Sequence, residues 1–393
     1  MKVYLDHAAT TPVDLTVLGE MLPYFTGKYG NPSSQHGFGQ EAAKAVEKAR
    51  IQVANAIGAK PAEIYFTSGG SESDNFAIKG IADAYSDKGK HVITTQIEHP
   101  AVLQSVEQLK KQGYRITYLG VGEDGRVSID ELKSAIRDDT VLISVMTANN
   151  EMGAIQPIKE IGEIAREHKI IFHTDAVQAI GSIPVNVKDM NVDLLSMSGH
   201  KFYGPKGIGA IYIRNGVKIT RFMSGGEQER NKRAGTLNTP GIVGLGKAIE
   251  LATENMKETS LKISLLRDYM KERIEEEIPE IRINGGMENR LPNNLNVSFR
   301  YVEGESILLM LDLEGISASS GSACSSGSLE PSHVLLAMGL PAELAHGSIR
   351  FTLGKETTQE EIDYTVDKLK GIIARLRAMS PLFCEHKGET HNV

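Results

Sequence analysis

Short apolar runs alternate with helical patterns of apolar residues from about residue 40 to 250. Within residues 40–56, Val46, Ala49 and Val53 recur at steps of three and four, which predicts an amphipathic helix. Runs typical of buried strands lie at 64–67, 91–97, 114–119, 141–146, 170–173 and 192–197. Because helical patterns separate several of these runs, we expect a mostly parallel sheet that is covered by helices, which is an α/β fold.

The pattern changes after about residue 252. A long charged helix is predicted first, and short strand-like runs and two further helices follow it, which indicates a second, smaller α+β unit. We therefore expect three parts: a large domain at 15–255, a small C-terminal domain made of 1–14 and 256–380, and a tail at 381–393.

Composition and charge exclude several classes of protein. The chain has 393 residues, of which 40% are hydrophobic and 24% charged, as in soluble globular proteins. Its 43 basic and 50 acidic residues give a net charge of −7, which does not favour nucleic acid. No apolar run approaches the roughly 20 residues of a membrane span. With only Cys324 and Cys384 and no signal-peptide core at the start, we expect a cytoplasmic protein without a disulfide framework.

Polar and glycine clusters follow five of the predicted strands. They are Ser68-Gly69-Gly70-Ser71, Glu98-His99, Asn149-Asn150, Asp175 with Gln178, and Ser198-Gly199-His200-Lys201. In open parallel sheets, ligands bind beyond the carboxyl ends of the strands. The five clusters therefore predict one pocket that is built from distant parts of the chain.

The chemistry of these clusters points to one cofactor. Gly70 and Ser71 lead directly into a helix predicted at 72–85, and the N–H groups at a helix start attract phosphate. Lys201 follows a buried strand, where desolvation makes an amine nucleophilic toward a carbonyl. Asp175 is placed to pair with a cationic ring nitrogen, and His99 to stack on a ring and move protons. Together these features describe a pyridoxal-phosphate site.

Two residues of the second unit are candidates for substrate chemistry. Cys324 lies in a Ser/Gly-rich run at 317–328, which taken alone indicates a flexible linker but also suits a travelling thiol. Arg350 is a candidate clamp for a substrate carboxylate, because its planar fork binds one bidentately, and a surface ion pair is the alternative.

The chain resembles the NifS/IscS-type cysteine desulfurases of the class V aminotransferase family, which are pyridoxal-phosphate enzymes of fold type I. The resemblance runs from about residue 4 to 382. The motifs that carry it are Tyr4-Leu5-Asp6-His7-Ala8-Ala9-Thr10-Thr11-Pro12, Gly30-Asn31-Pro32-Ser33-Ser34, Thr67 to Asn75, Glu98-His99, Asn149 to Gly153, Thr174 to Gln178, the Lys201 segment, Arg233-Ala234-Gly235-Thr236 and Gly321-Ser322-Ala323-Cys324. Gly70 stands where alanine is common in the family, and Ser71 where threonine is common.

The resemblance implies a role for each site residue. The cofactor would be linked to Lys201 and contacted by Asp175 at the ring nitrogen, by Gln178 at the ring hydroxyl, by His99 and Asn150, by Gly70, Ser71, Ser198 and His200 at the phosphate, and by Thr236 from the other subunit of a homodimer. Arg350, Asn150 and Asn31 would orient the substrate. The implied catalytic residues are Cys324, Lys201 and His99.

The implied reaction converts L-cysteine to L-alanine and leaves a persulfide on Cys324, with His99 as a proton acceptor. This sulfur would pass to an iron–sulfur scaffold protein or another acceptor, whose identity the sequence leaves open. No firm metal site is expected, and whether Cys324 also binds a transient iron–sulfur cluster stays open. The alternatives are another fold-type-I enzyme, such as a selenocysteine lyase or an aminotransferase, and a catalytically silent sulfur-relay scaffold.

Overall fold

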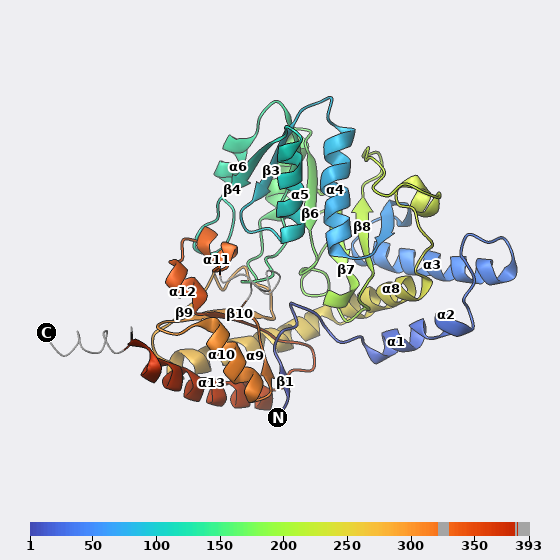
Figure 1. The fold of residues 1–393 in the computed structure, drawn as a ribbon. Coiled ribbons are helices and arrows are strands. Elements are labelled where there is room, and N and C mark those ends of the chain that lie inside the picture. The colour runs from blue at the N-terminus through green and yellow to red at the C-terminus, as the bar shows by residue number, and fades with distance from the viewer. Residues whose placement is uncertain (321–329, 382, 384–393) are drawn as a thin grey trace.

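A seven-stranded sheet forms the centre of the larger part of the molecule (Figure 1). The structure is a computed structural model, and it describes residues 1–320, 330–381 and 383. The strands, in sheet order, are β2 (Ile64–Thr67), β8 (Gly209–Ile213), β7 (Leu194–Ser198), β6 (Ile171–Asp175), β5 (Thr140–Ser144), β3 (His91–Thr95) and β4 (Arg115–Leu119). The five strands from β7 to β4 pair in parallel, so the expected α/β sheet is confirmed.

Strand β8 was not predicted, and it runs antiparallel to both of its neighbours, β2 and β7. Only the short 3-10 helix η2 (Gly199–Lys201) and a turn separate it from β7. A parallel return needs a crossover of a dozen or more residues. The connection is too short for this, so the chain turns back and places η2 at the end of the sheet.

Helices cover both faces of this sheet (Figure 1). On one face lie α4 (Gly70–Ala84) and α5 (Pro100–Lys111), and on the other lie α3 (Gly37–Ala56), α6 (Ile129–Ala135), α7 (Ile158–Glu167) and α8 (Thr239–Glu254). Successive side chains of a strand point to opposite faces of the sheet. Val92 packs in the core beneath α4 and α5, and Ile93 packs in the core on the opposite face. The sheet is therefore buried on both sides, as its apolar strands predict.

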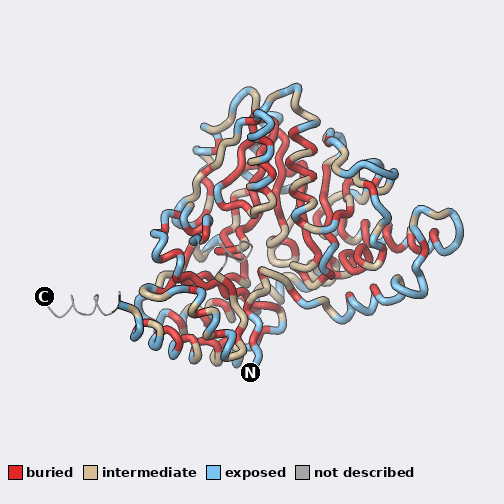
Figure 2. Tube along the Cα trace, viewed as in Figure 1, coloured by how far each residue is buried: buried red, intermediate tan, exposed pale blue. Residues whose placement is uncertain are grey.

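A second, antiparallel sheet has a core of its own. Its order is β12 (Ser348–Thr352), β10 (Asn294–Phe299) and β9 (Ile281–Ile283), and it packs with α9 (Met256–Glu277), α10 (Gly304–Leu313) and α13 (Gln359–Met379). The N-terminus joins this unit, because β1 (Val3–Tyr4) pairs in parallel with β11 (Ile316–Ser317). Figure 2 shows both buried interiors. We propose the domain boundaries at 14/15 and 255/256 on this basis.

The remaining helices lie at the edges of the two units. They are α1 (Leu15–Met21), α2 (Pro23–Thr26), η1 (Pro61–Glu63), η3 (Gln228–Asn231), α11 (His333–Ala337) and α12 (Ala342–His346). Within the described residues, no helix combines the length and the apolar character that crossing a membrane requires. The tail predicted at 381–393 lies outside the described residues except for Pro381 and Phe383.

Candidate active site

The loops at the carboxyl ends of five strands of the large sheet surround one cavity of about 320 Å³. Its lining includes Gly70 and Ser71 after β2, His99 after β3, Asn150 after β5, Asp175 and Gln178 at the end of β6, and Ser198, His200 and Lys201 after β7, with Arg350 from β12. The structure thus brings together ten of the sequence-predicted site residues. The volume lies within the range of small-molecule and cofactor sites, roughly 300–1,000 Å³.

The N-terminus of α4 forms one wall of this cavity. Its N-cap residue is Gly69, which has no side chain to satisfy the first N–H groups of the helix. Gly70 follows, and a Cβ there would lie 2.7 Å from Val177 Cγ2, closer than the two atoms can approach. With Val177 in this position, glycine is the residue that fits at position 70 without a shift of its neighbour.

Lys201 reaches across the cavity to the N-terminal segment. Its Nζ donates hydrogen bonds to the backbone oxygens of Ala8, at 2.5 Å, and of Ala9, at 2.8 Å. The same segment is tied to the lysine loop at a second point, because Thr11 N and Oγ1 both donate to the carbonyl oxygen of His200. The amine is therefore held at a fixed place between two elements that lie far apart in sequence.

Asp175 is 6% exposed and stands at the end of β6. Its Oδ1 accepts a hydrogen bond from Val177 N at 2.8 Å. Burial raises the pKa of this carboxyl, and the nearby His99 and Lys201 side chains act in the opposite direction. A buried carboxylate at a cavity wall is stabilised by a cationic partner, so this position suits a ligand with a positive charge.

His99 is the N-cap of α5, and its Nδ1 accepts a hydrogen bond from Ala101 N at 3.1 Å. An acceptor at Nδ1 requires the proton of the neutral ring to lie on Nε2. Burial lowers the pKa of His99, which favours this neutral form. The ring can therefore donate a hydrogen bond from Nε2, whereas accepting a proton there requires it to change tautomer and give up the cap.

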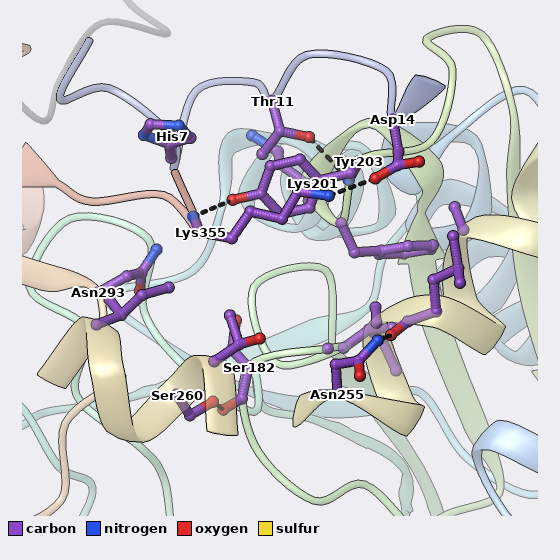
Figure 3. A pocket seen from close by; sticks show the side chains of 18 of the residues that line it. His7, Thr11, Asp14, Ser182, Lys201, Tyr203, Asn255, Ser260, Asn293 and Lys355 are labelled. Atoms are coloured by element: carbon purple, nitrogen blue, oxygen red, sulfur yellow. Dashed lines mark hydrogen bonds and ion pairs between the residues drawn. The ribbon is translucent and has the colours of Figure 1, made fainter. Parts of the chain in front are cut away.

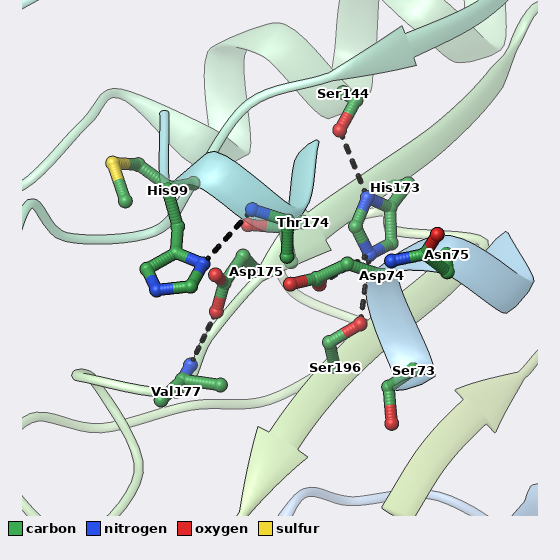
Figure 4. A network of polar contacts seen from close by, with 12 residues as sticks. Ser73, Asp74, Asn75, His99, Ser144, His173, Thr174, Asp175, Val177 and Ser196 are labelled. Atoms are coloured by element: carbon green, nitrogen blue, oxygen red, sulfur yellow. Dashed lines mark hydrogen bonds and ion pairs between the residues drawn. The ribbon is translucent and has the colours of Figure 1, made fainter. Parts of the chain in front are cut away.

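A buried chain of polar side chains lies behind Asp175 (Figure 4). His173 is within hydrogen-bond distance of Ser144, at 2.9 Å, and of Ser196, at 3.0 Å, and its Nε2 lies 3.7 Å from Asp74 Oδ1. Burial lowers the pKa of His173 to about 3. Burial, and then the charge of Asp175, raise the pKa of Asp74 well above its usual range. Asp74 therefore tends to stay protonated beside Asp175.

Glu98 is a further buried acid next to the site. Its Oε1 accepts hydrogen bonds from Thr95 Oγ1 and Met146 N, both at 2.9 Å. Its Oε2 is buried and has no partner in the described part of the chain. Burial raises the pKa of Glu98 to about 8. The side chain fixes the start of the His99 loop, and at neutral pH it favours its protonated form.

Arg350 enters the cavity from the small sheet and is 3% exposed. One terminal nitrogen, NH1, donates to the backbone oxygen of Asn150 at 3.0 Å, and the other, NH2, donates to Asp6 Oδ1 at 2.7 Å. Backbone hydrogen bonds in both directions join Arg350 to Ser319. The guanidinium therefore sits where the two units and the N-terminal segment meet.

Three predicted site residues are not part of this cavity as described. Asn31 is exposed, and its Oδ1 accepts a hydrogen bond from Ser33 N. Thr236 is exposed on the segment that precedes α8. Cys324 lies outside the described residues. After the segment that contains Cys324, Ser332 Oγ donates to Glu151 Oε2 at 2.5 Å.

Several residues that line or support the cavity were assigned no role from the sequence. They are Asp6, Ala8, Ala9 and Asp74. The N-terminal motif contains the first three, so the signal was present, but two of them act through backbone oxygens, which side-chain chemistry does not reveal. Asp74 lies one helical turn after Gly70, and that spacing places it on the same side of α4.

A second cavity of about 370 Å³ lies beyond the N-terminal segment and shares Lys201 and Gln178 with the first (Figure 3). Lys355 pairs with Asp14 there, and its backbone N donates to Tyr203 Oη at 2.7 Å. Thr11 Oγ1 accepts a hydrogen bond from Tyr203 N. These contacts fix the segment from behind, so that Ala8 and Ala9 keep their place against Lys201.

The residues around the first cavity fit pyridoxal phosphate. A primary amine, a buried carboxylate for a cationic ring nitrogen and a helix N-terminus for a phosphate are on its walls. Ser71, Ser198 and the His200 ring, whose pKa burial lowers to about 4, add neutral donors near the helix start. This donor set matches the charges at the opposite ends of that molecule.

Comparisons with known proteins agree with this geometry. The family model described as "Aminotransferase class-V" matches residues 3–365. A "Cysteine desulfurase IscS" from Dictyoglomus turgidum is 58% identical over 386 residues, covering 98% of both chains. One from Methanosarcina thermophila is 58% identical over 380 residues, covering 97% of this chain and 94% of the relative.

Solved structures give the same result. One described as a NifS-like protein has a TM-score of 0.90 and 41% identity, covering 95% of this chain and all of that one. Another, "SspA in complex with cysteine", has a TM-score of 0.81 and 38% identity over 91% of this chain. The structure contains both units, the lysine loop and Asp175 at the cavity wall. Together with these matches, this shows that the chain belongs to the aminotransferase class-V family, among relatives that are cysteine desulfurases.

Proposed function

We propose that this protein is a pyridoxal-phosphate-dependent cysteine desulfurase, which converts L-cysteine to L-alanine and carries the released sulfur as a persulfide on Cys324. The observation that carries the proposal is the placement of Lys201 and Asp175 on the walls of one buried cavity that begins at the N-terminus of α4. Full-length identity of 58% to cysteine desulfurases supports the same activity.

Different residues of the chain would hold different parts of the cofactor. Lys201 provides the amine for its aldehyde, and Asp175 provides the negative charge opposite its ring nitrogen. Gly70, Ser71, Ser198 and His200 would hold its phosphate, and Gln178 and His99 would lie beside its ring. When bound, pyridoxal phosphate supplies an electron-withdrawing ring that makes the Cα proton of an amino acid acidic.

Arg350 receives the carboxylate of the substrate, with Asn150 beside it. An arginine on this wall fixes which end of the amino acid points away from Lys201. Lys201 would accept the Cα proton of the substrate as a neutral amine, since its Nζ lies in the cavity beside the backbone oxygens of Ala8 and Ala9. His99 carries its proton on Nε2 and can donate a hydrogen bond from that atom.

Sulfur transfer falls to Cys324. Its thiolate attacks the substrate sulfur, an S–S bond forms as the substrate C–S bond breaks, and the electron pair of that bond stays on the carbon skeleton. The skeleton gains protons and leaves as L-alanine. The persulfide is a group that thiol exchange can hand to another thiol. We propose an iron–sulfur scaffold protein or a related sulfur carrier as the acceptor, in the cytoplasm.

We also propose that the working unit is a homodimer. Large apolar side chains are exposed on α1, on α2 and just after α2: Leu15 is 84% exposed, Phe25 58% and Tyr29 67%. Apolar patches of this kind are typical of subunit interfaces. Thr236 is exposed on its own chain, so it is available to complete the phosphate site of a second subunit.

The direct test is to add L-cysteine to the purified holoenzyme and to measure alanine and the mass of the peptide that contains Cys324. We expect one alanine for each sulfur that is bound or released, and an added mass of one sulfur on Cys324. Cys324→Ser should keep the cofactor's absorbance and lose the persulfide, while the matched variant Cys384→Ser should keep both. Alanine formed at the normal rate by Cys324→Ser would refute the role of this thiol.

The same assay separates the alternatives. Exchange of amino groups with a keto acid, without release of sulfur, would identify an aminotransferase instead. A strong preference for selenocysteine over cysteine would identify a selenocysteine lyase. Absence of any alanine from the cofactor-loaded protein would identify a sulfur-relay scaffold.

A further inference from the structure

We propose that Asp6 is a positioning residue of this active site, which holds the guanidinium of Arg350 in the orientation that receives the carboxylate of the substrate. The inference rests on the proposed function, because it takes cysteine as the substrate. It concerns a residue of the N-terminal segment that neither binds the cofactor nor belongs to the small sheet's own β12 strand.

The geometry around Arg350 defines the plane of its guanidinium. Asp6 Oδ1 accepts from NH2 at 2.7 Å, and the backbone oxygen of Asn150 accepts from NH1 at 3.0 Å. These two acceptors come from different parts of the chain, the N-terminal segment and the loop after β5. Its Nε is buried and has no hydrogen-bond partner among the described residues. Since an arginine has five N–H donors, donors remain for a ligand carboxylate.

Asp6 is itself held by backbone contacts. It forms a β-bridge with Thr352, and its neighbour Leu5 donates to Ser317 O at 2.8 Å and accepts from Thr352 N at 2.7 Å. Since His7 N also donates to Thr352 O at 3.2 Å, backbone contacts hold the segment to β12 on both sides of the carboxylate. A rigid acceptor restricts the arginine side chain before the substrate arrives, which lowers the entropy lost on binding.

Charge favours the same role. The guanidinium is 3% exposed, and a buried cation without a partner is strongly unfavourable. Asp6, whose side chain is 18% exposed, is the carboxylate that pairs with it. Removing Asp6 should therefore let the guanidinium turn away toward other acceptors or water. It should not remove the charge that attracts the substrate.

Asp6 lies two residues before Ala8, whose backbone oxygen accepts from Lys201. A general loosening of this segment would therefore disturb the lysine as well as the arginine. The two effects differ in what they change. Displacing Lys201 affects turnover of every substrate, whereas misplacing Arg350 affects only substrates that carry a carboxylate. The experiment must separate these two outcomes.

The test compares Asp6→Ala with Asp6→Asn in the cofactor-loaded enzyme. We expect Asp6→Ala to raise KM for L-cysteine by about tenfold or more, with kcat within about threefold of the parent, because a displaced clamp weakens binding. Asp6→Asn keeps an oxygen acceptor at the same place, so its KM should return to within about threefold of the parent. An unchanged or lower KM for Asp6→Ala would overturn the proposal.

Two controls distinguish positioning from loosening. Asp14→Ala breaks the ion pair with Lys355, which fixes the same segment, without touching Arg350, so it reports loosening alone and should not raise KM for L-cysteine as Asp6→Ala does. Spectral titration with cysteine methyl ester, which lacks the carboxylate, should give equal affinities for the parent and Asp6→Ala. Equal weakening of the ester, or an equal effect of Asp14→Ala, would show a structural role only and overturn the proposal.

The outcomes are separable from those of the proposed function. If the parent enzyme does not convert cysteine, the proposed function has failed, whereas a normal KM in Asp6→Ala removes only the role of Asp6. Arg350→Ala is the positive control, and it should raise KM at least as much as Asp6→Ala does. If Asp6→Ala does not fold, Asp6→Ser, whose hydroxyl is too short to reach the guanidinium, should give the same KM readout.

Discussion

The side-chain amine of Lys201 donates a hydrogen bond to the backbone oxygen of Ala8 at 2.5 Å, although the two residues are 193 positions apart. The contact closes the active-site cavity with a segment that belongs neither to the large sheet nor to its covering helices. The amine is therefore positioned by the N-terminal segment as well as by the loop after β7.

Lys201→Ala should prevent stable attachment of pyridoxal phosphate. Among the described residues, Lys201 is the only lysine that lines the cavity. The measurement is the visible absorbance of the loaded protein, followed by borohydride reduction and peptide mass spectrometry. Lys206→Ala, an exposed lysine of the same loop, should behave as the parent. Cofactor trapped on another lysine of the parent would remove Lys201 from this role.

His99→Asn should weaken cofactor binding and slow turnover by about tenfold or more, because the ring and its Nε2 proton are lost. Asparagine is a favoured N-cap, so the start of α5 should persist and thermal stability should change little. Cofactor affinity and kcat are measured together with the melting temperature. Ser128→Asn, the same replacement at the N-cap of α6, is the control. Unaltered affinity and kcat would reduce His99 to a structural cap.

Phe25→Glu should dissociate the proposed homodimer. A charge placed on this exposed apolar side chain of α2 would be buried without a partner at the interface. Sedimentation velocity of the parent and the variant measures the change, and cofactor affinity should fall with it if Thr236 serves the other subunit. Leu313→Glu, at an 86% exposed leucine of α10, should leave the dimer intact. A parent that sediments as a monomer would contradict the proposal.

Glu98→Gln should flatten the pH dependence of stability between about pH 4.5 and 8. Burial raises the pKa of Glu98 from 4.5 to about 8, so in this range the folded chain holds a proton that the unfolded chain has lost. The free energy of unfolding therefore falls as the pH rises, by at most about 1.4 kcal/mol per pH unit from this group. Glutamine imitates the protonated acid and removes that contribution.

Urea denaturation of the parent and of Glu98→Gln at several pH values measures the effect. The stability difference should shift in favour of the variant as the pH rises. Glu276→Gln, at an exposed position of α9, should run parallel to the parent. Parallel curves for Glu98→Gln as well would mean that Glu98 is ionised in the folded protein.

The sequence predicted the sheet and the residues at its carboxyl edge because both follow from local patterns. Asp175 and Lys201 lie at or just after the ends of apolar strands. The carboxyl ends of parallel strands lie at the same edge of a sheet, so these residues are expected to lie close together. Strand β8 was not predicted, because no helical crossover precedes it and the chain returns to the sheet through a short turn. Helix α4 begins at Gly70, two residues before the predicted start, since Gly69 rather than a polar side chain is its N-cap.

Other parts of the site had no local signal. Ala8 and Ala9 act through backbone oxygens, which every residue has, and Asp6 meets Arg350 only because β1 joins the small sheet. The place of Thr236 in the site depends on a second subunit in our proposal, and Asn31 does not line the cavity as described. Their roles, and the domain boundaries, stay predictions.

Two residues on either side of Cys324, Ser319 and Ser332, are held by hydrogen bonds, and the length of chain from each of them limits its distance from Cys324. Ser319 is fixed to Arg350 by backbone hydrogen bonds, and Ser332 to Glu151 by its hydroxyl. An extended chain spans at most about 3.6 Å per residue, so the Cα of Cys324, five residues from Ser319, stays within about 18 Å of that anchor. The sulfur of a cysteine lies only a few ångströms beyond its Cα, so any acceptor must bring its own thiol inside or close to this sphere, which makes delivery a question of docking geometry as much as of chemistry.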